Sequence, residues 1–417
     1  MKTVTVLAAG SRGDVQPFLA LAFGLAGRGH PVRLVSNAIY ADLARSYGLE
    51  FRPLTWDPRE AMRLQTRLGA ERNPFVIVRK QLENTRRVYA TVQAESWQAC
   101  RDAQLLLFSV LSPWGYSISE KAGIPCVAGM LHPLEPTRAF PMQLIAPDLG
   151  GGLNRLSHLL AEQLFQAAAG GDINRFRRGL GLPALRFPDT LFGQLRKTGT
   201  PMLCNLSPAV LPRPVDWPER IHMDGYWFLP PPPAWRPQAE LADFLAAGDA
   251  PVCIGFGSLV SGDLEGTRRL VDEALQGSGR RGILLTGWGG LAGAGSDPKR
   301  TLSAGDLPHA WLFERAAAAV HHGGAGTTSA ALRAGIPQVI IAHMQDQLYW
   351  GRKMHRLGVS PAPLRRAGLS AGALAEAIST ALQDGNIRSR AVEIGGRVRA
   401  EAGLEKTLAV IEAYFGL

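Results

Sequence analysis

Apolar runs of strand length alternate with helical patterns along residues 1–130 of the chain. Apolar positions recur at helical spacing in residues 17–28, 37–47 and 113–122. Strands are predicted where the chain is continuously apolar, at residues 3–9, 32–36, 50–54, 104–109 and 125–129. Continuous apolar strands that alternate with helices are typical of a parallel sheet covered on both faces. The pattern therefore predicts a doubly wound α/β domain.

The same alternation restarts after a proline-rich stretch. Residues 229–235 include four consecutive prolines, which cannot form regular helix or sheet, so a semi-rigid linker is predicted there. A helix is expected at 264–276, and a mostly helical tail begins at 371. Further strands are expected at residues 251–256, 283–286, 317–321 and 338–342. Two Rossmann-like domains are thus predicted, facing a cleft at the carboxyl ends of their strands.

The predicted boundaries divide the chain into four parts. These are a first domain at 1–228, a linker at 229–250, a second domain at 251–400, and a C-terminal helix at 401–417 that can pack back on the first domain. Residues 149–192 carry helical patterns after a run of glycines, and they are predicted to form an insertion or lid in the first domain.

Composition narrows the class of protein. Hydrophobic residues make up 46% and charged residues 19%, as expected for a globular protein. The four cysteines form no C-x-x-C pair, so neither a zinc site nor a disulfide framework is implied. No leader and no apolar run long enough to span a membrane is visible in the sequence, so a cytoplasmic protein is expected.

The net charge of +10 indicates either attraction to polyanions or a solvated surface with scattered arginines. The short arginine clusters lack interleaved aromatic residues, so nucleic acid is not expected as a partner. A diphosphate substrate, or transient contact with an anionic membrane, fits the charge better.

A glycine cluster is the most informative segment. Residues 320–329 read Val-His-His-Gly-Gly-Ala-Gly-Thr-Thr-Ser, in which a buried strand ends at the histidines and a helix begins near Gly326. Glycines let the backbone approach a bulky ligand, and the first amides of a helix favour an anion. His322, Thr327 and Thr328 can donate to phosphate oxygens. The alternative is an ordinary glycine-rich turn with a threonine cap.

The residues that follow favour a ligand site. After Gly335-Ile336-Pro337 and a further strand, an Asp346-Gln347 pair can bond the vicinal hydroxyls of a sugar. From about 307 to 359 the chain resembles the donor-sugar signature of family 1 glycosyltransferases of GT-B fold. That resemblance implies that His322 and Thr327, with Gly324 and Thr328, hold the diphosphate, and that Asp346 and Gln347 hold the sugar.

A second Gly-x-Gly-Ser turn follows the strand at 251–256. The resemblance implies a donor-side role for Gly257 and Ser258, with Ser258 contacting the diphosphate; an ordinary strand-end turn is the alternative. Trp288 is a candidate wall of the base pocket and equally a packing residue. The family's base-stacking tryptophan is missing, since Asp306-Leu307-Pro308-His309 stands in its place.

No metal is expected. The chain has no Asp-x-Asp and no histidine or cysteine spacing suited to a metal, so charge on the leaving group is assigned to the helix N-terminus, His322 and hydroxyls. His321 and His322 are adjacent and should point to opposite sides of their strand.

A candidate base lies in the first half. The segment Gly10-Ser11-Arg12-Gly13-Asp14-Val15-Gln16-Pro17 follows the first strand, and Pro17 is expected in the first turn of the next helix, which places Asp14 in the preceding loop. The segment resembles the Gly-Ser-x-Gly-Asp-Val-x-Pro motif of antibiotic-type and sterol-type glycosyltransferases. Asp14 is therefore the candidate general base; its alternative role is to offset a helix dipole. Arg12 is a candidate to hold Asp14 ionised or to touch the diphosphate.

The acceptor is assigned to the first domain. Residues 130–141 follow a strand and resemble the corresponding loop of sterol-type enzymes. Phe75, Trp114, His132 and Phe140 are candidate pocket residues, with plain packing as the alternative for each.

These features together predict an inverting, metal-independent transferase. It would move a hexose, glucose before others, from a UDP- or TDP-sugar to a hydroxyl of a lipophilic molecule such as a sterol or polyketide. A monomer or weak homodimer is expected. The alternatives are a non-catalytic partner of the same fold and a nucleotide-sugar epimerase or hydrolase. A dinucleotide-dependent dehydrogenase is disfavoured because the first loop lacks G-x-G-x-x-G.

Overall fold

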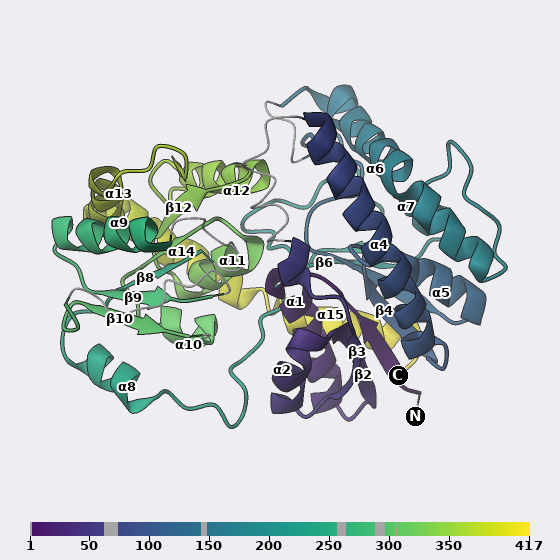
Figure 1. Cartoon of the computed structure of the whole chain (residues 1–417), viewed down its shortest axis with the longest axis horizontal. Helices are drawn as coiled ribbons and strands as arrows, with labels where there is room; N and C mark the ends of the chain where they lie inside the picture. Colours follow the sequence, from purple (N-terminus) through teal and green to yellow (C-terminus); the bar gives the residue numbers. More distant parts are fainter. Residues whose placement is uncertain (1, 62–73, 143–147, 257–263, 288–296, 306) are drawn as a thin grey trace. The chain divides into compact units, whose positions relative to one another are not determined.

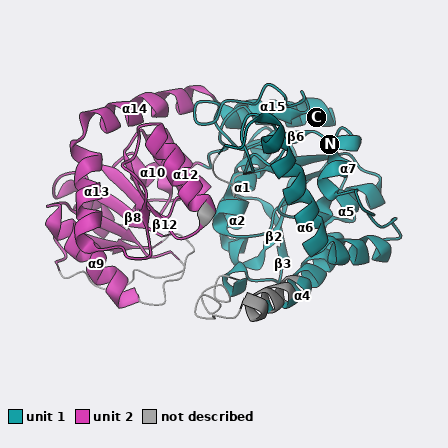
Figure 2. Cartoon of the chain, turned by 90° about the horizontal axis from the view of Figure 1, so that it is seen from above, with its two compact units in different colours: residues 1–229, 402–417 teal, residues 230–401 magenta. Residues whose placement is uncertain are grey.

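The computed structural model describes residues 2–61, 74–142, 148–256, 264–287, 297–305 and 307–417. The chain forms two compact units (Figure 2). Unit 1 comprises residues 1–229 together with 402–417, and unit 2 comprises residues 230–401. Each unit is an α/β structure around its own parallel sheet (Figure 1).

Unit 1 contains a seven-stranded parallel sheet in the order β3-β2-β1-β4-β5-β6-β7. Its strands are β1 (Val4–Leu7), β2 (Val32–Asn37), β3 (Glu50–Leu54), β4 (Leu105–Ser109), β5 (Cys126–Met130), β6 (Met202–Cys204) and β7 (Ile221–His222). Its helices are α1 (Arg12–Gly27), α2 (Ala41–Ser46), α4 (Pro74–Cys100), α5 (Trp114–Ala122), α6 (Gly151–Gly179), α7 (Leu191–Lys197) and α15 (Gly403–Phe415). The central strands are fully buried, which is why they are continuously apolar in sequence.

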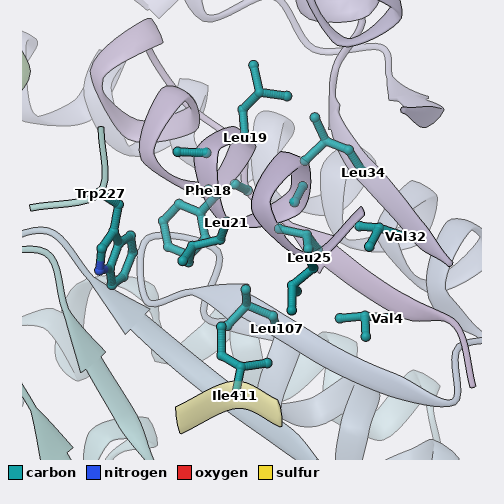
Figure 3. Packing of buried hydrophobic residues seen from close by; sticks show 14 of the residues in the cluster. Val4, Phe18, Leu19, Leu21, Leu25, Val32, Leu34, Leu107, Trp227 and Ile411 are labelled. Carbon is teal, nitrogen blue, oxygen red and sulfur yellow. The ribbon is translucent and has the colours of Figure 1, made fainter. Parts of the chain in front are cut away.

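The core of unit 1 joins the start and the end of the chain (Figure 3). Phe18 and Leu21 of α1 pack with Trp227 and with Ile411 of α15. The indole Nε1 of Trp227 donates to the Thr407 hydroxyl at 2.9 Å. α15 therefore completes the hydrophobic core that β1 and α1 begin.

Unit 2 contains a six-stranded parallel sheet in the order β10-β9-β8-β11-β12-β13. Its strands are β8 (Val252–Gly255), β9 (Gly282–Leu285), β10 (Thr301–Ala304), β11 (Ala318–His321), β12 (Gln338–Ala342) and β13 (Leu364–Arg365). Its helices are α8 (Ala239–Ala246), α9 (Leu264–Gly277), α10 (His309–Phe313), α11 (Ala325–Ala334), α12 (Gln345–Arg356), α13 (Ala371–Gln383) and α14 (Gly385–Ala400). The predicted pair of doubly wound parallel sheets is confirmed.

Three local predictions were wrong. α1 begins at Arg12, so Pro17 lies inside the helix and Asp14 lies in its first turn instead of in a loop. α8 forms within the stretch expected to be linker, because only its first residues are proline-rich. Residues 38–40 form a 3-10 turn before α2, where one continuous helix was expected.

Candidate functional site

In each sheet there is one position where the direction in which successive strands are added reverses. In unit 1 the chain runs outward from β1 to β3 and then returns to place β4 beside β1; in unit 2 it does the same with β8 and β11. Open α/β sheets bind ligands outside the carboxyl ends of the strands at such a switch point. The two motifs singled out from the sequence follow β1 and β11, so each lies at the switch point of its own sheet.

In unit 1, the loop after β1 is fixed by side chains of neighbouring loops. The Ala9 amide donates to the Ser112 hydroxyl at 3.1 Å, and the Gly10 amide donates to Oδ1 of Asn37 at 2.8 Å. The Tyr40 hydroxyl donates to the Gly10 carbonyl at 3.2 Å. The backbone that precedes Asp14 is therefore held on both sides.

Asp14 caps the helix on which it lies. Its Oδ2 accepts hydrogen bonds from the Ser11 amide at 2.8 Å and the Ser11 hydroxyl at 2.7 Å. Among the described residues, no group donates to Oδ1. A Cβ at Gly10, whose φ is +143°, would stand 2.6 Å from Oδ2. Glycine at that position therefore makes room for the carboxylate.

The surroundings of Asp14 raise the pKa of its carboxyl group. Burial raises the pKa of the Asp14 carboxyl above its ordinary value, and the hydrogen bonds from Ser11 and the charge of His132 offset part of that rise. A carboxylate with a raised pKa is a stronger base. The structure thus shows Asp14 as a helix cap, and its raised pKa is compatible with the predicted role as a base.

The other residues proposed for unit 1 have different surroundings. His132, in the loop after β5, is close enough to influence Asp14 electrostatically. The Arg12 guanidinium donates along its own helix to Gln16 at 3.1 Å. Trp114 is buried and donates to the Ser96 hydroxyl at 2.8 Å, so it packs α5 against α4. Phe75 lies in α4, and its side chain is outside the described part of the structure.

Phe140 packs at one end of the loop that follows β5. Its ring contacts those of His158 and Trp217, with centroids 6.0 and 6.4 Å apart. The same loop is anchored at Asp216, which accepts from the Thr137 hydroxyl at 2.6 Å and from the Arg138 amide at 2.8 Å. This loop is therefore rigidly attached to the segment before β7.

A buried ion network supports that loop and was missed in the sequence. Glu162 of α6 binds the Arg196 guanidinium through both oxygens at 2.7 and 2.6 Å. Glu135, in the loop, pairs with Arg220 and lies 3.9 Å from Arg196. Burial raises the pKa of Glu135, while Arg220 and Arg196 lower it. The residues of this ion network are far apart in the chain, so the sequence pattern did not indicate that they would meet.

In unit 2, the glycine turn joins β11 to α11. Gly323 has a φ of +87°, and a Cβ there would lie 3.0 Å from the Gln347 carbonyl and from Ile340. Gly324 is the N-cap of α11, and a Cβ on it would lie 2.4 Å from Nε2 of His322. Two glycines are thus required, one by the backbone conformation and one by the imidazole packed against it.

His321 holds the turn from the buried side. Its Nδ1 accepts from the Gly323 amide at 3.0 Å, and its Nε2 lies 2.9 Å from Oε1 of Gln338. These partners define a neutral tautomer with the proton on Nε2. Burial lowers the pKa of His321 to about 4, which keeps this tautomer at neutral pH.

Three polar atoms near the turn are buried without a hydrogen-bond partner among the described residues. They are Nδ1 of His322, Oγ1 of Thr328 and Nε2 of His343. Burial lowers the pKa of His322 to about 3, with His321 and His343 adding to the shift, and that of His343 to about 4. Buried polar atoms without a partner are costly unless a ligand or water satisfies them, so this edge of the sheet has the chemistry of an anion or polyol site.

The Asp346-Gln347 pair lies in the first turn of α12, beside the glycine turn. Oε1 of Gln347 accepts from the amides of His343 and Met344 at 2.9 and 3.2 Å, so this oxygen caps the helix. A sugar contact from Gln347 would therefore use its NH2 group. Asp346 is half-buried, and its carboxylate accepts no hydrogen bond within the described ranges. Gly257, Ser258 and Trp288 lie outside the described residues.

The chain is similar to known proteins over both units. Residues 4–141 match the model of the glycosyltransferase family 28 N-terminal domain, and residues 293–404 match that of the erythromycin biosynthesis protein CIII-like C-terminal domain. A sterol 3-beta-glucosyltransferase of Emericella nidulans is 35% identical over 422 residues, which cover 98% of this chain and 30% of the relative. The chain thus spans less than a third of that relative's length.

Solved structures share the fold. The glycotransferase of kitacinnamycin superposes with a TM-score of 0.70 at 18% identity, over 99% of each chain. The glycosyltransferase VinC, solved in complex with dTDP, gives a TM-score of 0.66 at 18% identity, also over 99% of each chain. At these identities the likeness establishes the architecture of the two units.

Proposed function

We propose that this chain is a family 1 glycosyltransferase of GT-B fold, which moves a sugar from a nucleoside diphosphate sugar to a hydroxyl of a lipophilic molecule; the two matching family models and the sterol 3-beta-glucosyltransferase relative support this proposal. One observation carries the donor part of this proposal: buried atoms of His322, Thr328 and His343 around the glycine turn have no hydrogen-bond partner in the described part of the chain. A diphosphate supplies acceptor oxygens, and a sugar supplies hydroxyls.

The diphosphate binds at the N-terminus of α11. Ala325, Gly326 and Thr327 form the first turn of this helix, whose free amides and positive dipole end favour negative charge. Because His322 is neutral, its imidazole donates to a phosphate oxygen through one N–H. Negative charge that develops on the leaving diphosphate is stabilised by these dipoles, and no metal ion is required.

Asp14 acts as the general base. Its Oδ1 accepts the proton of the acceptor hydroxyl while the oxygen attacks the anomeric carbon, and Oδ2 stays bonded to Ser11. The new C–O bond forms as the bond to the diphosphate breaks, and the nucleoside diphosphate leaves. Attack from the face opposite the leaving group inverts the anomeric centre. General base catalysis of this kind contributes roughly 100- to 10,000-fold.

The acceptor is a hydrophobic alcohol. Support comes from the curated relative, whose substrate by name is a sterol and whose sugar is glucose. The loop after β5 is the acceptor-side element, since it carries His132 beside Asp14 and is anchored through Asp216. UDP-glucose and TDP-glucose are the donors to compare, because the structural relative VinC is described with dTDP.

The experiment incubates the protein with each donor and with a panel of sterols, aromatic polyketides and long-chain alcohols. Mass spectrometry should find an acceptor gaining one hexose, and the anomeric proton coupling of the product should report inversion. Addition of EDTA should leave the rate unchanged. Nucleotide binding without transfer to any acceptor would support a non-catalytic partner, and donor hydrolysis alone would support a hydrolase.

A further inference from the structure

Helix α6 has the opposite exposure pattern to an ordinary surface helix. Its buried positions include polar side chains, whereas five leucines are exposed. The exposed set is Leu153 (57%), Leu156 (46%), Leu159 (37%), Leu160 (53%) and Leu164 (71%). Four of these, at positions 153, 156, 160 and 164, follow one stripe of the helix. We call these five residues the leucine face.

The rotation of α6 is fixed by its polar side. Nδ2 of Asn154 donates to the Arg138 carbonyl at 3.1 Å, and the Ser157 hydroxyl accepts from the Met142 amide at 2.8 Å. Nε2 of His158 lies 3.1 Å from the Phe140 carbonyl. These bonds are made to the acceptor-side loop, so turning the leucines inward would break them. The hydrogen bonds on the polar side of α6 therefore keep the leucine face exposed.

The charges around this face have one prevailing sign. Arg155 lies among the leucines, and Arg138 and Arg178 are exposed near the two ends of the helix. Arg175 is also exposed and pairs with Asp172 of the same helix at 2.5 Å. Glu162, the acid within the leucine segment, is turned inward and bound to Arg196. Asp148, just before the helix, is exposed and is engaged by Asn154 and the Gly150 amide.

An aromatic side chain extends the apolar surface. Phe187 is 87% exposed in the segment after α6. The carbonyl of the next residue, Pro188, accepts from Gln163 of α6 at 2.8 Å, which holds this segment against the helix. Figure 1 shows α6 running along α4, which covers one of its sides. Within the described residues, no helix is long and apolar enough to cross a bilayer.

We propose that the leucine face of α6 docks the protein on the surface of an anionic lipid bilayer. A helix with leucines on one side and flanking arginines lies in the headgroup region, where its leucines reach the acyl chains and its arginines meet anionic lipid. The role of this docking rests on the proposed function: a lipophilic acceptor dissolves in the bilayer, and α6 directly supports the loop assigned to acceptor binding. The evidence for the binding surface itself comes only from α6 and does not depend on the proposed function.

The test uses the full chain and vesicles of phosphatidylcholine with or without roughly one-third phosphatidylserine. Flotation should recover the parent with the anionic vesicles, less with neutral ones, and less at high salt. The variant Leu156→Glu with Leu160→Glu should bind at least tenfold more weakly. Val392→Glu, which adds one charge at another exposed apolar side chain of 62% exposure, is the control and should bind as the parent does.

Outcomes that overturn the proposal are distinct from those that overturn the enzymatic function. Vesicle binding that is absent in the parent, or unchanged in the double variant, removes the docking surface. A parent that is dimeric by light scattering and becomes monomeric in the double variant, without binding vesicles, makes the leucine face a contact between copies. Glucosyl transfer to a detergent-dispersed acceptor is assayed in parallel. It should be unchanged in the double variant, whereas transfer to a vesicle-embedded acceptor should fall at least tenfold.

Discussion

Asp14 and Ser11 are joined by two hydrogen bonds, both of which end on the same carboxylate oxygen, Oδ2. The cap therefore occupies one oxygen and holds the plane of the carboxylate. Among the described residues, no group donates to the second oxygen, Oδ1. In the proposed reaction Oδ1 takes the proton, and the cap on α1 is kept.

Replacing Asp14 by asparagine separates these roles. Asparagine can still accept from Ser11, so α1 should start normally, but it cannot take a proton. The rate of sugar transfer should fall roughly 100- to 10,000-fold, with nucleotide affinity unchanged. Single-turnover kinetics and calorimetric titration with the nucleoside diphosphate measure the two quantities. A variant as fast as the parent would make Asp14 purely structural.

The pH dependence follows from the raised pKa of Asp14. Transfer needs the carboxylate, so kcat/KM should rise as the pH increases through a pKa above the ordinary value of 3.8. In Ser11→Ala this acidic limb should move to still higher pH, because the hydroxyl hydrogen bond that is lost stabilises the charged form, while the backbone amide bond remains. A profile that keeps the same midpoint in Ser11→Ala would assign the limb to another group. For stability the sign is opposite: the protonated form is favoured on folding, so this contribution is present at low pH and is lost as the pH rises through the folded-state pKa.

Gly10→Ala tests the space that the carboxylate occupies. A Cβ would stand 2.6 Å from Oδ2 of Asp14 on a backbone with φ of +143°, so unfolding stability should fall by about 1–3 kcal/mol. Activity should fall as well, since Asp14 must move. Gly27→Ala, at the end of the helix α1 that follows this loop and with nothing within 4 Å of the added carbon, is the control. Chemical denaturation should find that control as stable as the parent or slightly more so.

The buried histidines of unit 2 predict loss of stability in acid. The pKa of His321 is lowered to about 4, so between its unfolded value of 6.5 and about 4 the unfolded chain binds more protons. Stability should therefore decrease as the pH falls through this window, by about 3 kcal/mol for this fully buried residue. The melting temperature of the parent should drop in that range. The melting temperature of His321→Leu should be lower at neutral pH and should change less with pH. A pH dependence as steep as that of the parent would assign the effect to other groups.

His322→Ala should weaken nucleotide binding. Loss of one hydrogen bond to a charged phosphate is worth about 1.5–3 kcal/mol, or roughly ten- to a hundredfold in Kd. Calorimetry with UDP and TDP measures the change, and an unchanged melting temperature of the free protein shows that the turn is intact. If the affinity stays the same, the diphosphate does not bind at this histidine.

The strands were predictable because buried parallel strands are continuous apolar runs, as in β4 and β12. β10 was missed because Thr301–Ala304 is short and half polar, and it is a strand only because β9 pairs with it. The start of α1 differs from the prediction because Pro17 does not mark the first turn: Ser11 and Asp14 form the cap, and Pro17 lies inside the helix. The inverted exposure of α6 could not be inferred, since its polar side is satisfied by residues distant in sequence.

Residues 402–417 are made after all of unit 2, yet Leu408, Ile411 and Phe415 belong to the hydrophobic core of unit 1. During synthesis, the apolar side of α1 that α15 later covers must stay uncovered while some 170 intervening residues emerge and acquire their own fold. Unit 1 is therefore the first to be synthesised, but its core is completed only after that of unit 2. A nascent chain at this stage exposes apolar surface on its N-terminal half, which favours aggregation.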